Sequence, residues 1–232
     1  MRKKRIHSDR RPAVITGVLL LAGLVAGLFS VVPVINGADY LAKASTQEYQ
    51  VLVGAFSQLL MIVAYVGIPI CLYPILSKHH KGVALGSVAF GIIAGVFIMM
   101  GVIVLLLLLT LSHEFSNLGA SNSSYVQTLG GLLREGRDLV NHVATTLAFA
   151  LAMLLFNCIF YQTKIIPRWL SVSGILGSAL SILASLLFMI RFIGLDASYM
   201  TLNVPIAIQQ LVLAIWLILK GFNRVDALEK GV

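Results

Sequence analysis

The composition of this 232-residue chain, with 59% hydrophobic and 11% charged residues, excludes an ordinary soluble domain, which would carry about 25% charged residues. A formal net charge of +8 could indicate a nucleic-acid-binding protein. The basic residues, however, stand beside long apolar stretches, where membrane insertion and anionic head groups account for them. We therefore expect a lipid bilayer around the chain and no nucleic-acid partner.

Six apolar stretches follow one another along the chain, and a helix of about 20 apolar residues crosses the roughly 30 Å hydrocarbon core of a bilayer. They are residues 12–34, 51–76, 82–111, 139–161, 169–190 and 204–219. The third stretch is long enough that it must tilt or extend beyond the lipid. The sequence therefore predicts an all-α fold: a polytopic integral membrane protein whose six transmembrane helices form a single domain over residues 1–232.

The distribution of positive charge predicts the orientation of this bundle. If the amino terminus lies inside, only 4 of the 17 Lys and Arg residues fall in outer segments: Lys43, Arg134, Arg137 and Arg191. Basic residues close to span ends favour the cytoplasmic side during insertion. We therefore expect both termini in the cytoplasm.

The longest segment between spans, residues 112–138, is predicted to be an outer loop. It begins polar, and from Tyr125 apolar residues recur mostly at three- and four-residue steps. This pattern predicts an amphipathic helix that leads into the fourth span and lies along the membrane interface.

Prolines and glycines mark special positions within the spans. Pro69 and Pro74 each remove a helix hydrogen bond and kink the second span, whereas Pro205 is expected in the first turn of the sixth, where proline is tolerated. Small residues three or four apart form faces on which helices can pack closely. These faces contain Gly23 and Gly27, Gly82 and Gly86, Gly91 and Gly95, and Gly174 and Gly177. They serve either packing inside the bundle, which we favour, or contact with a second copy or a partner membrane protein.

Polar side chains recur at one depth in the second, fourth and sixth spans, although polar groups within a span are costly and therefore suggest a site. They are Gln58, Asn141, His142, Thr145, Thr146, Gln209 and Gln210, with Arg137 and Asp138 just above them. At a rise of 1.5 Å per residue, these groups share a depth of about 5–12 Å below the outer surface. We predict a water-accessible pocket there, with five ligand-binding residues: Arg137, Asp138, His142, Gln58 and Gln210. The alternative is hydrogen bonding between helices, worth about 0.6 kcal/mol per contact.

Motifs for catalysis, cofactors or metals are not recognisable in the sequence. His79-His80 and His113-Glu114 have no partners at ligand spacing, and no phosphate-binding glycine loop, nucleophile elbow or zinc-binding helix occurs. We therefore expect no cofactor, no metal site and no catalytic residue, and an intramembrane enzyme is the least favoured class of function.

Three segments carry a family resemblance: Arg137-Asp138, the run from Lys164 to Ser171 with Gly174 after it, and the run from Pro205 to Asn223. With the glycine-rich span beginning at Val14, they make the chain similar to bacterial membrane proteins catalogued as domain of unknown function 4386. The resemblance covers nearly the whole chain and implies a six-helix protein of the bacterial inner membrane, without assigning an activity, cofactor or catalytic residue. Family members commonly carry glutamate where this chain has Gln210, and glutamine cannot carry a proton, which argues against proton coupling at this position.

Two functions remain from these observations. The favoured one is binding or movement of a small molecule or lipid through the outer-facing polar cluster. The other is an accessory protein without substrate that packs against a partner through its glycine faces.

Overall fold

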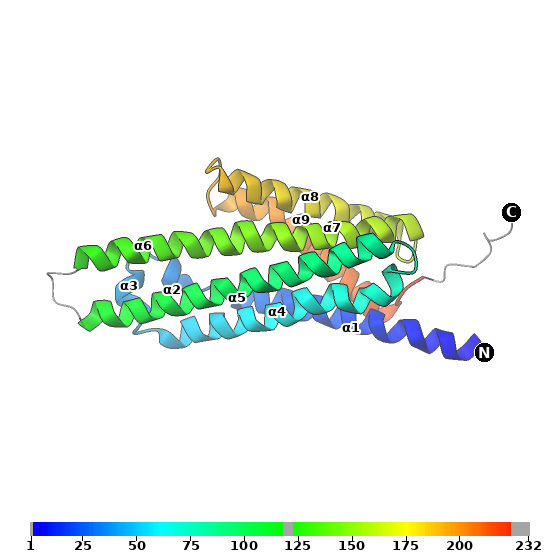
Figure 1. The fold of residues 1–232 in the computed structure, drawn as a ribbon, viewed down its shortest axis with the longest axis horizontal. Helices are drawn as coiled ribbons and strands as arrows, with labels where there is room; N and C mark the ends of the chain where they lie inside the picture. Colours follow the sequence, from blue (N-terminus) through cyan, green and yellow to red (C-terminus); the bar gives the residue numbers. More distant parts are fainter. Residues whose placement is uncertain (1, 118–122, 224–232) are drawn as a thin grey trace.

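The computed structural model describes residues 2–117 and 123–223, with side chains from 10–116 and 124–223. These ranges are helical and contain no strand. The elements are α1 (Arg2–Phe29), α2 (Pro33–Asn36), α3 (Tyr40–Lys43), α4 (Glu48–Leu76), α5 (Lys81–Asn117), α6 (Ser123–Leu139), η2 (Val140–Thr145), α7 (Thr146–Thr163), α8 (Arg168–Met189) and α9 (Ala197–Leu219). Figure 1 shows the long helices running side by side, with α6, η2 and α7 as one rod.

Six helices in the described ranges are long and apolar enough to cross a membrane. They are Arg10–Phe29, Glu48–Leu76, Lys81–Ser116, Ser124–Thr163, Arg168–Met189 and Ala197–Leu219. This confirms the predicted all-α class and the predicted number of spans.

The two ends of the bundle differ. The terminal end carries the start of α1 and the end of α9, and the hairpin end carries α2, α3 and the tips of α5 and α6 (Figure 1). The long helices form a closed ring in which α1 packs on α4, α4 on α5, α5 on α7, α7 on α8, α8 on α9, and α9 on α1. This ring encloses the space in which the candidate site lies.

The predicted outer loop 112–138 is largely helical, because α5 continues to Asn117 and α6 begins at Ser123. The predicted position of α6 along the membrane interface also differs from the structure, where α6 packs on α5 and continues through η2 into α7. The physical reason is a second apolar core at the hairpin end, in which Val126 of α6 meets buried side chains of α2, α3, α4 and α5. Packing against protein removes the apolar stripe of α6 from water without help from lipid.

Two further differences at helix ends involve prolines. The first span ends at Phe29 rather than near residue 34, because Pro33 opens the separate short helix α2. The sixth span begins earlier than predicted, at Ala197, where the Asp196 side chain accepts a hydrogen bond from the Ser198 main-chain N–H. Pro205 therefore lies inside α9 and not in its first turn, so α4 and α9 both contain internal prolines.

The glycine faces mostly serve packing within the chain. A Cβ atom at Gly91 would lie 2.5 Å from Cγ of Pro69, and one at Gly177 would lie 2.9 Å from the main-chain nitrogen of Ile206. Gly95 similarly lies against Val66 of α4. Gly27, by contrast, faces open space. These glycines therefore allow helix backbones to approach each other closely within the bundle.

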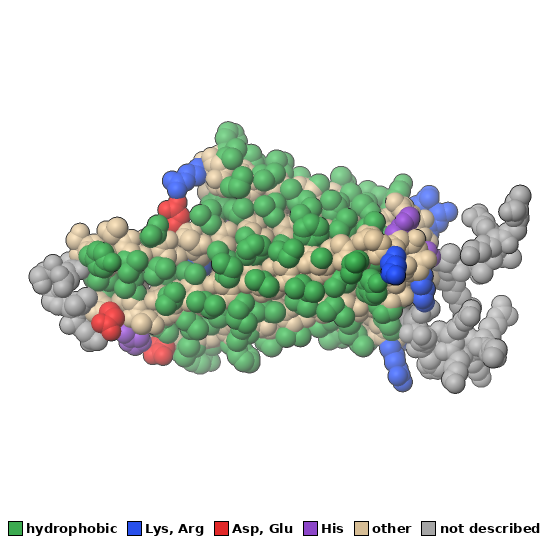
Figure 2. Space-filling model, in the orientation of Figure 1, with side chains coloured by type: hydrophobic (Ala, Val, Ile, Leu, Met, Phe, Trp, Pro, Cys, Tyr) green, Lys and Arg blue, Asp and Glu red, His purple; other side chains and the backbone are tan. Residues whose placement is uncertain are grey.

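The surface has a hydrophobic belt with charge at its ends. Figure 2 shows one face, where hydrophobic side chains cover the middle of the bundle and Lys and Arg side chains gather at the terminal end. The described basic residues on that end are Arg10, Arg11, Lys78, Lys81, Lys164, Arg168 and Lys220. The side chains of Arg2–Arg5 and residues 224–232 lie outside the described part of the chain, so they are not included among these basic residues.

Candidate functional site

A cavity of about 500 Å³ lies inside the ring, in the half nearer the hairpin end. On α9 its wall runs from Met200 to Gln210, which corresponds to about 15 Å at 1.5 Å per residue. Toward the terminal end the ring is filled by fully buried side chains, among them Leu72, Phe156 and Leu213. The cavity is therefore closed on that side.

The structure brings all five predicted ligand-binding residues to this cavity. Gln58 comes from α4, Arg137 and Asp138 from α6, His142 from η2 and Gln210 from α9. Asn141, Thr145 and Thr146 of the predicted polar cluster also line the cavity, whereas Gln209 does not. Their proximity supports the predicted pocket, and their role in binding a ligand stays a prediction.

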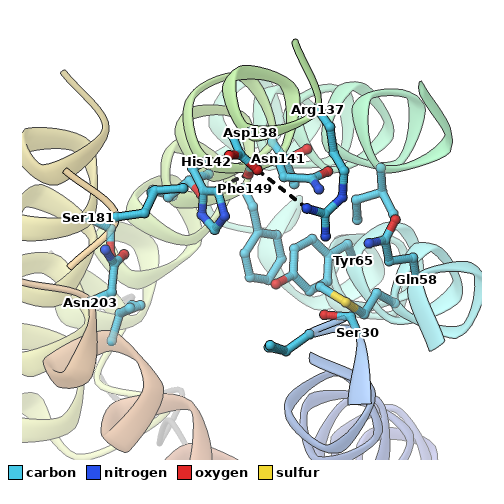
Figure 3. A pocket seen from close by; sticks show the side chains of 18 of the residues that line it. Ser30, Gln58, Tyr65, Arg137, Asp138, Asn141, His142, Phe149, Ser181 and Asn203 are labelled. Atoms are coloured by element: carbon cyan, nitrogen blue, oxygen red, sulfur yellow. Dashed lines mark hydrogen bonds and ion pairs between the residues drawn. The ribbon is translucent and has the colours of Figure 1, made fainter. Parts of the chain in front are cut away.

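Arg137 is the most unusual residue of the cavity wall, because a guanidinium is rarely buried without a strong partner. Its side chain is 7% exposed, and its Nη1 donates to Oδ1 of Asp138 at 3.4 Å, a long contact. Its Nε has no hydrogen-bond partner within the described protein, and neither does Oε1 of Gln58. Figure 3 shows the Arg137 guanidinium and the Gln58 amide directed into the same space.

Two hydroxyls extend this set of unpaired groups. Thr145 Oγ1 and Ser181 Oγ are buried, line the cavity and have no partner among the described residues. Buried polar atoms in proteins are normally hydrogen-bonded to protein or to water. The cavity wall therefore contains donors and acceptors that the described part of the protein does not satisfy.

The residues below Arg137 make an apolar wall. Tyr65 of α4 and Phe149 of α7 stack with ring centroids 3.6 Å apart, and Met61 and Ile206 line the same space. At the deep end, Nε2 of Gln210 donates to the Met153 sulfur at 3.0 Å. The cavity thus has a polar region around Arg137 and an apolar region beneath it, as ligand sites in proteins generally do.

A π-helical turn, η2, shapes the wall beside Arg137. In such a turn the i→i+5 pattern replaces the α-helical one, and π-turns inside α-helices occur frequently at functional sites. The His142 carbonyl accepts hydrogen bonds from Ser185 Oγ at 2.8 Å and from the Tyr199 hydroxyl at 3.1 Å. These contacts fix η2 to α8 and α9. Sequence reasoning missed Ser185, Tyr199 and η2, since no pattern in a single sequence distinguishes a π-turn from an α-helix.

Arg134 closes the hairpin end of the cavity. Its guanidinium donates to the main-chain oxygens of Asn36 at 2.6 Å and Gly37 at 3.1 Å, and it lies 5.5 Å from the centre of the Tyr40 ring. Burial raises the pKa of the Tyr40 phenol more than the nearby Arg134 lowers it, so the ring stays neutral. Arg134 therefore ties α2 and α3 to α6. The sequence identified it only as an outer basic residue.

Gln209 illustrates a polar residue used for packing. Its Nε2 lies 3.3 Å from Oδ1 of Asn157 on α7, and Asn157 in turn donates to the Met153 carbonyl at 2.9 Å. Both side chains are buried away from the cavity. As for metals, no three His, Cys, Asp or Glu side chains gather as ligands within the described residues.

A ring of six apolar helices around a closed-bottom cavity defines a multi-pass membrane protein. The family model described as "Domain of unknown function (DUF4386)" matches residues 15–221, and the chain belongs to this family, as its resemblance predicted. No curated protein and no solved structure gives a significant match to the chain. The family description assigns no activity, so the cavity is the feature of the molecule that bears on its function.

Proposed function

We propose that this membrane protein binds a small molecule or lipid in the cavity between α4, α6, η2, α7 and α9. The residues that hold the ligand are Arg137, Asp138, His142, Gln58 and Gln210. One observation carries the proposal: Arg137 and Gln58 line one cavity, and Nε of Arg137 and Oε1 of Gln58 are buried without a hydrogen-bond partner among the described residues. The volume of about 500 Å³ supports it, because small-molecule sites usually enclose about 300–1,000 Å³.

Helix packing alone is a weaker explanation of these residues. Polar residues that serve packing contact each other across helices, as Gln209 Nε2 and Asn157 Oδ1 do at 3.3 Å, although Oε1 of Gln209 has no partner among the described residues. Gln58 and Arg137 face a cavity instead, and a buried polar atom without a partner costs about 1–3 kcal/mol. A ligand that pairs with them recovers that cost on binding.

Movement of the ligand would require the bundle to open at the terminal end, where apolar side chains now close it. The internal prolines of α4 and α9 support such a motion, because proline is a common site of helix bending. Binding is therefore the primary function that we propose, and movement is an extension of it.

We further propose that both termini face the cytoplasm of a bacterium and that the cavity lies toward the outer face of its plasma membrane. The basic residues on the terminal end support this orientation. Alkaline phosphatase, which needs an oxidising compartment for its disulfides, should be inactive when fused to the carboxyl terminus and active when inserted at Ser45. The reverse pattern would contradict the orientation.

Native mass spectrometry of the protein released gently from its own membrane tests the binding proposal. The wild type should carry a reproducible bound mass, and Arg137→Ala should lose it. The control is Lys43→Ala, which removes a positive charge at the same end of the bundle from an exposed pair with Asp39. A wild-type subunit without bound mass, or a mass that Arg137→Ala retains, would contradict the proposal.

A further inference from the structure

Positive charge predominates where the cavity reaches the hairpin end. Arg134 and Arg137 line it there, and Asp138 is the one acidic side chain among the described lining residues. The partners of Arg134 are main-chain carbonyls, which leave its charge uncompensated. An excess of guanidinium groups favours a carboxylate or phosphate, with which they form charge-assisted hydrogen bonds.

A second cavity, of about 630 Å³, adjoins the first between α6 and the connection from α8 to α9. The two share Arg134, Asp138 and Leu195 in their linings. The rest of the second lining is rich in apolar side chains: Leu139, Phe188, Met189, Phe192 and Ile193. Leu139, Met189 and Phe192 are exposed on the outside of the bundle, as side chains that meet lipid would be.

An ion pair crosses this side opening. Glu135 of α6 and Arg191, just after α8, both line the second cavity and bind each other at the surface. The pair lies at the level where α8 ends and α9 begins, which is where charged groups meet lipid head groups. Because exposed ion pairs contribute little to stability, this one can separate while the bundle stays folded.

The axial route from water is bordered by a packed segment. The segment with α2 and α3 packs over the hairpin end, where Val32 and Ile35 are fully buried and Arg134 holds the main chain of Asn36 and Gly37. A ligand from water would have to pass this segment, whose Asn36 lines the cavity together with Arg134. A ligand already in the membrane meets the Glu135–Arg191 pair and then the shared lining of Arg134, Asp138 and Leu195.

We propose, on the basis of the function proposed above, that the ligand is an anionic membrane lipid that reaches the cavity sideways. Its acidic head group passes between α6 and the α8–α9 connection and binds Arg137, with Arg134 adding positive charge. Its acyl part stays along the apolar side opening, beside Leu139, Met189 and Phe192. This arrangement matches the polar and apolar regions of the two linings to the two parts of one amphiphile.

Two glycines of α6 provide a matched pair of variants for the test. A Cβ atom at Gly131 or at Gly136 would meet nothing within 4 Å, so a larger side chain fits at either position. Gly131 lines the side opening, whereas Gly136 lines neither cavity. Gly131→Phe should therefore plug the opening, and Gly136→Phe should leave it clear. Gly131→Leu is a smaller plug for use if the Phe variant does not fold.

The experiment is native mass spectrometry of each variant from nanodiscs that contain phosphatidylglycerol and phosphatidylcholine. The wild type and Gly136→Phe should retain phosphatidylglycerol in preference to phosphatidylcholine, and Gly131→Phe should retain about tenfold less. Arg137→Ala should lose the preference for the anionic lipid. Inorganic phosphate, titrated into the same samples, should not displace the lipid at millimolar concentration.

Three results would overturn the inference, and one of them would also contradict the proposed function. Phosphatidylglycerol bound equally by wild type and Gly131→Phe would refute the side route. Inorganic phosphate bound through Arg137, with no lipid retained, would show a ligand from water and leave the proposed function standing. The absence of any ligand that depends on Arg137, lipid or soluble, would contradict the proposed function as well.

Discussion

The hydroxyl of Tyr199 on α9 donates a hydrogen bond to the main-chain carbonyl of His142 in η2, at 3.1 Å. Ser185 of α8 donates to the same oxygen at 2.8 Å. Two helices that follow later in the chain thus hold the π-turn that carries one wall of the cavity. The His142 ring also packs edge-on against Tyr199, with 5.3 Å between the ring centres.

Removal of these two donors should be non-additive. Tyr199→Phe and Ser185→Ala should each lower the free energy of unfolding by about 0.6 kcal/mol, because the other donor still serves the carbonyl. The double variant removes both side-chain donors from this oxygen and should lose about 1–3 kcal/mol in total, more than the sum of the two single losses. Unfolding in mixed detergent micelles measures all three, with the exposed Ser198→Ala as the control. Strictly additive losses would show that the two donors do not share one acceptor.

The charge of the cavity should control the affinity for an anionic ligand in both directions. Asp138→Asn removes the carboxylate that competes with an anionic ligand for Arg137 but keeps a hydrogen-bonding side chain in the lining, so it should strengthen binding of phosphatidylglycerol several-fold. Gln210→Glu adds a carboxylate at the deep end and should weaken it about tenfold, because charges repel more strongly in a site with little water. Gln210→Met removes the amide without adding charge, so it measures the loss that does not come from charge and should weaken binding less than Gln210→Glu. Equal affinities for Asp138→Asn, Gln210→Glu and Gln210→Met would contradict a role of charge in binding.

Close packing of α5 on α4 should make Gly91 intolerant of a side chain. A Cβ atom there would lie 2.5 Å from Cγ of Pro69 and 3.0 Å from the Tyr65 carbonyl oxygen. Gly91→Ala should therefore destabilise the bundle by about 1–3 kcal/mol, as overpacked core variants do. Gly136→Ala, with open space around its Cβ, should be neutral or stabilising by up to about 1 kcal/mol. Thermal unfolding of the two variants compares them directly, and equal losses would mean that the glycine contact is not close.

The polar pair between α7 and α9 should affect stability but not binding. Gln209→Met removes the 3.3 Å contact with Asn157, and interhelical hydrogen bonds of this kind are worth about 0.6 kcal/mol on average. The bound mass in native mass spectrometry should stay at the wild-type level, since neither side chain lines the cavity. Loss of the ligand from Gln209→Met would show that the cavity extends further than its lining residues indicate.

Counting depth along the spans at a fixed rise per residue predicted which polar residues would lie near one another, and most of them line one cavity in the structure. Gln58, His142 and Gln210 are far apart in sequence, and a fixed rise per residue from the predicted span ends placed them near one level. In the structure all three line one cavity, with Gln210 at its deep end because α9 begins earlier than predicted. The same arithmetic could not separate Gln209 from Gln210. A rotation of about 100° between neighbouring helix positions directs Gln209 to Asn157 and Gln210 to the cavity wall.

Apolar length and basic residues at span ends determined, from the sequence alone, the all-α class and the number of spans, because the bilayer fixes how long a crossing helix must be. Only the tertiary structure decided where the polar ends of the helices lie. Helices α5, α6 and α9 extend beyond their apolar stretches because neighbouring elements contact them and a side chain caps α9. The tertiary structure alone also shows the π-turn of η2, the hydrogen bonds from Arg134 to the segment with α2 and α3, and the side opening beside Glu135 and Arg191. Each of these depends on groups brought together from distant parts of the chain, and local sequence carries no signal of such contacts.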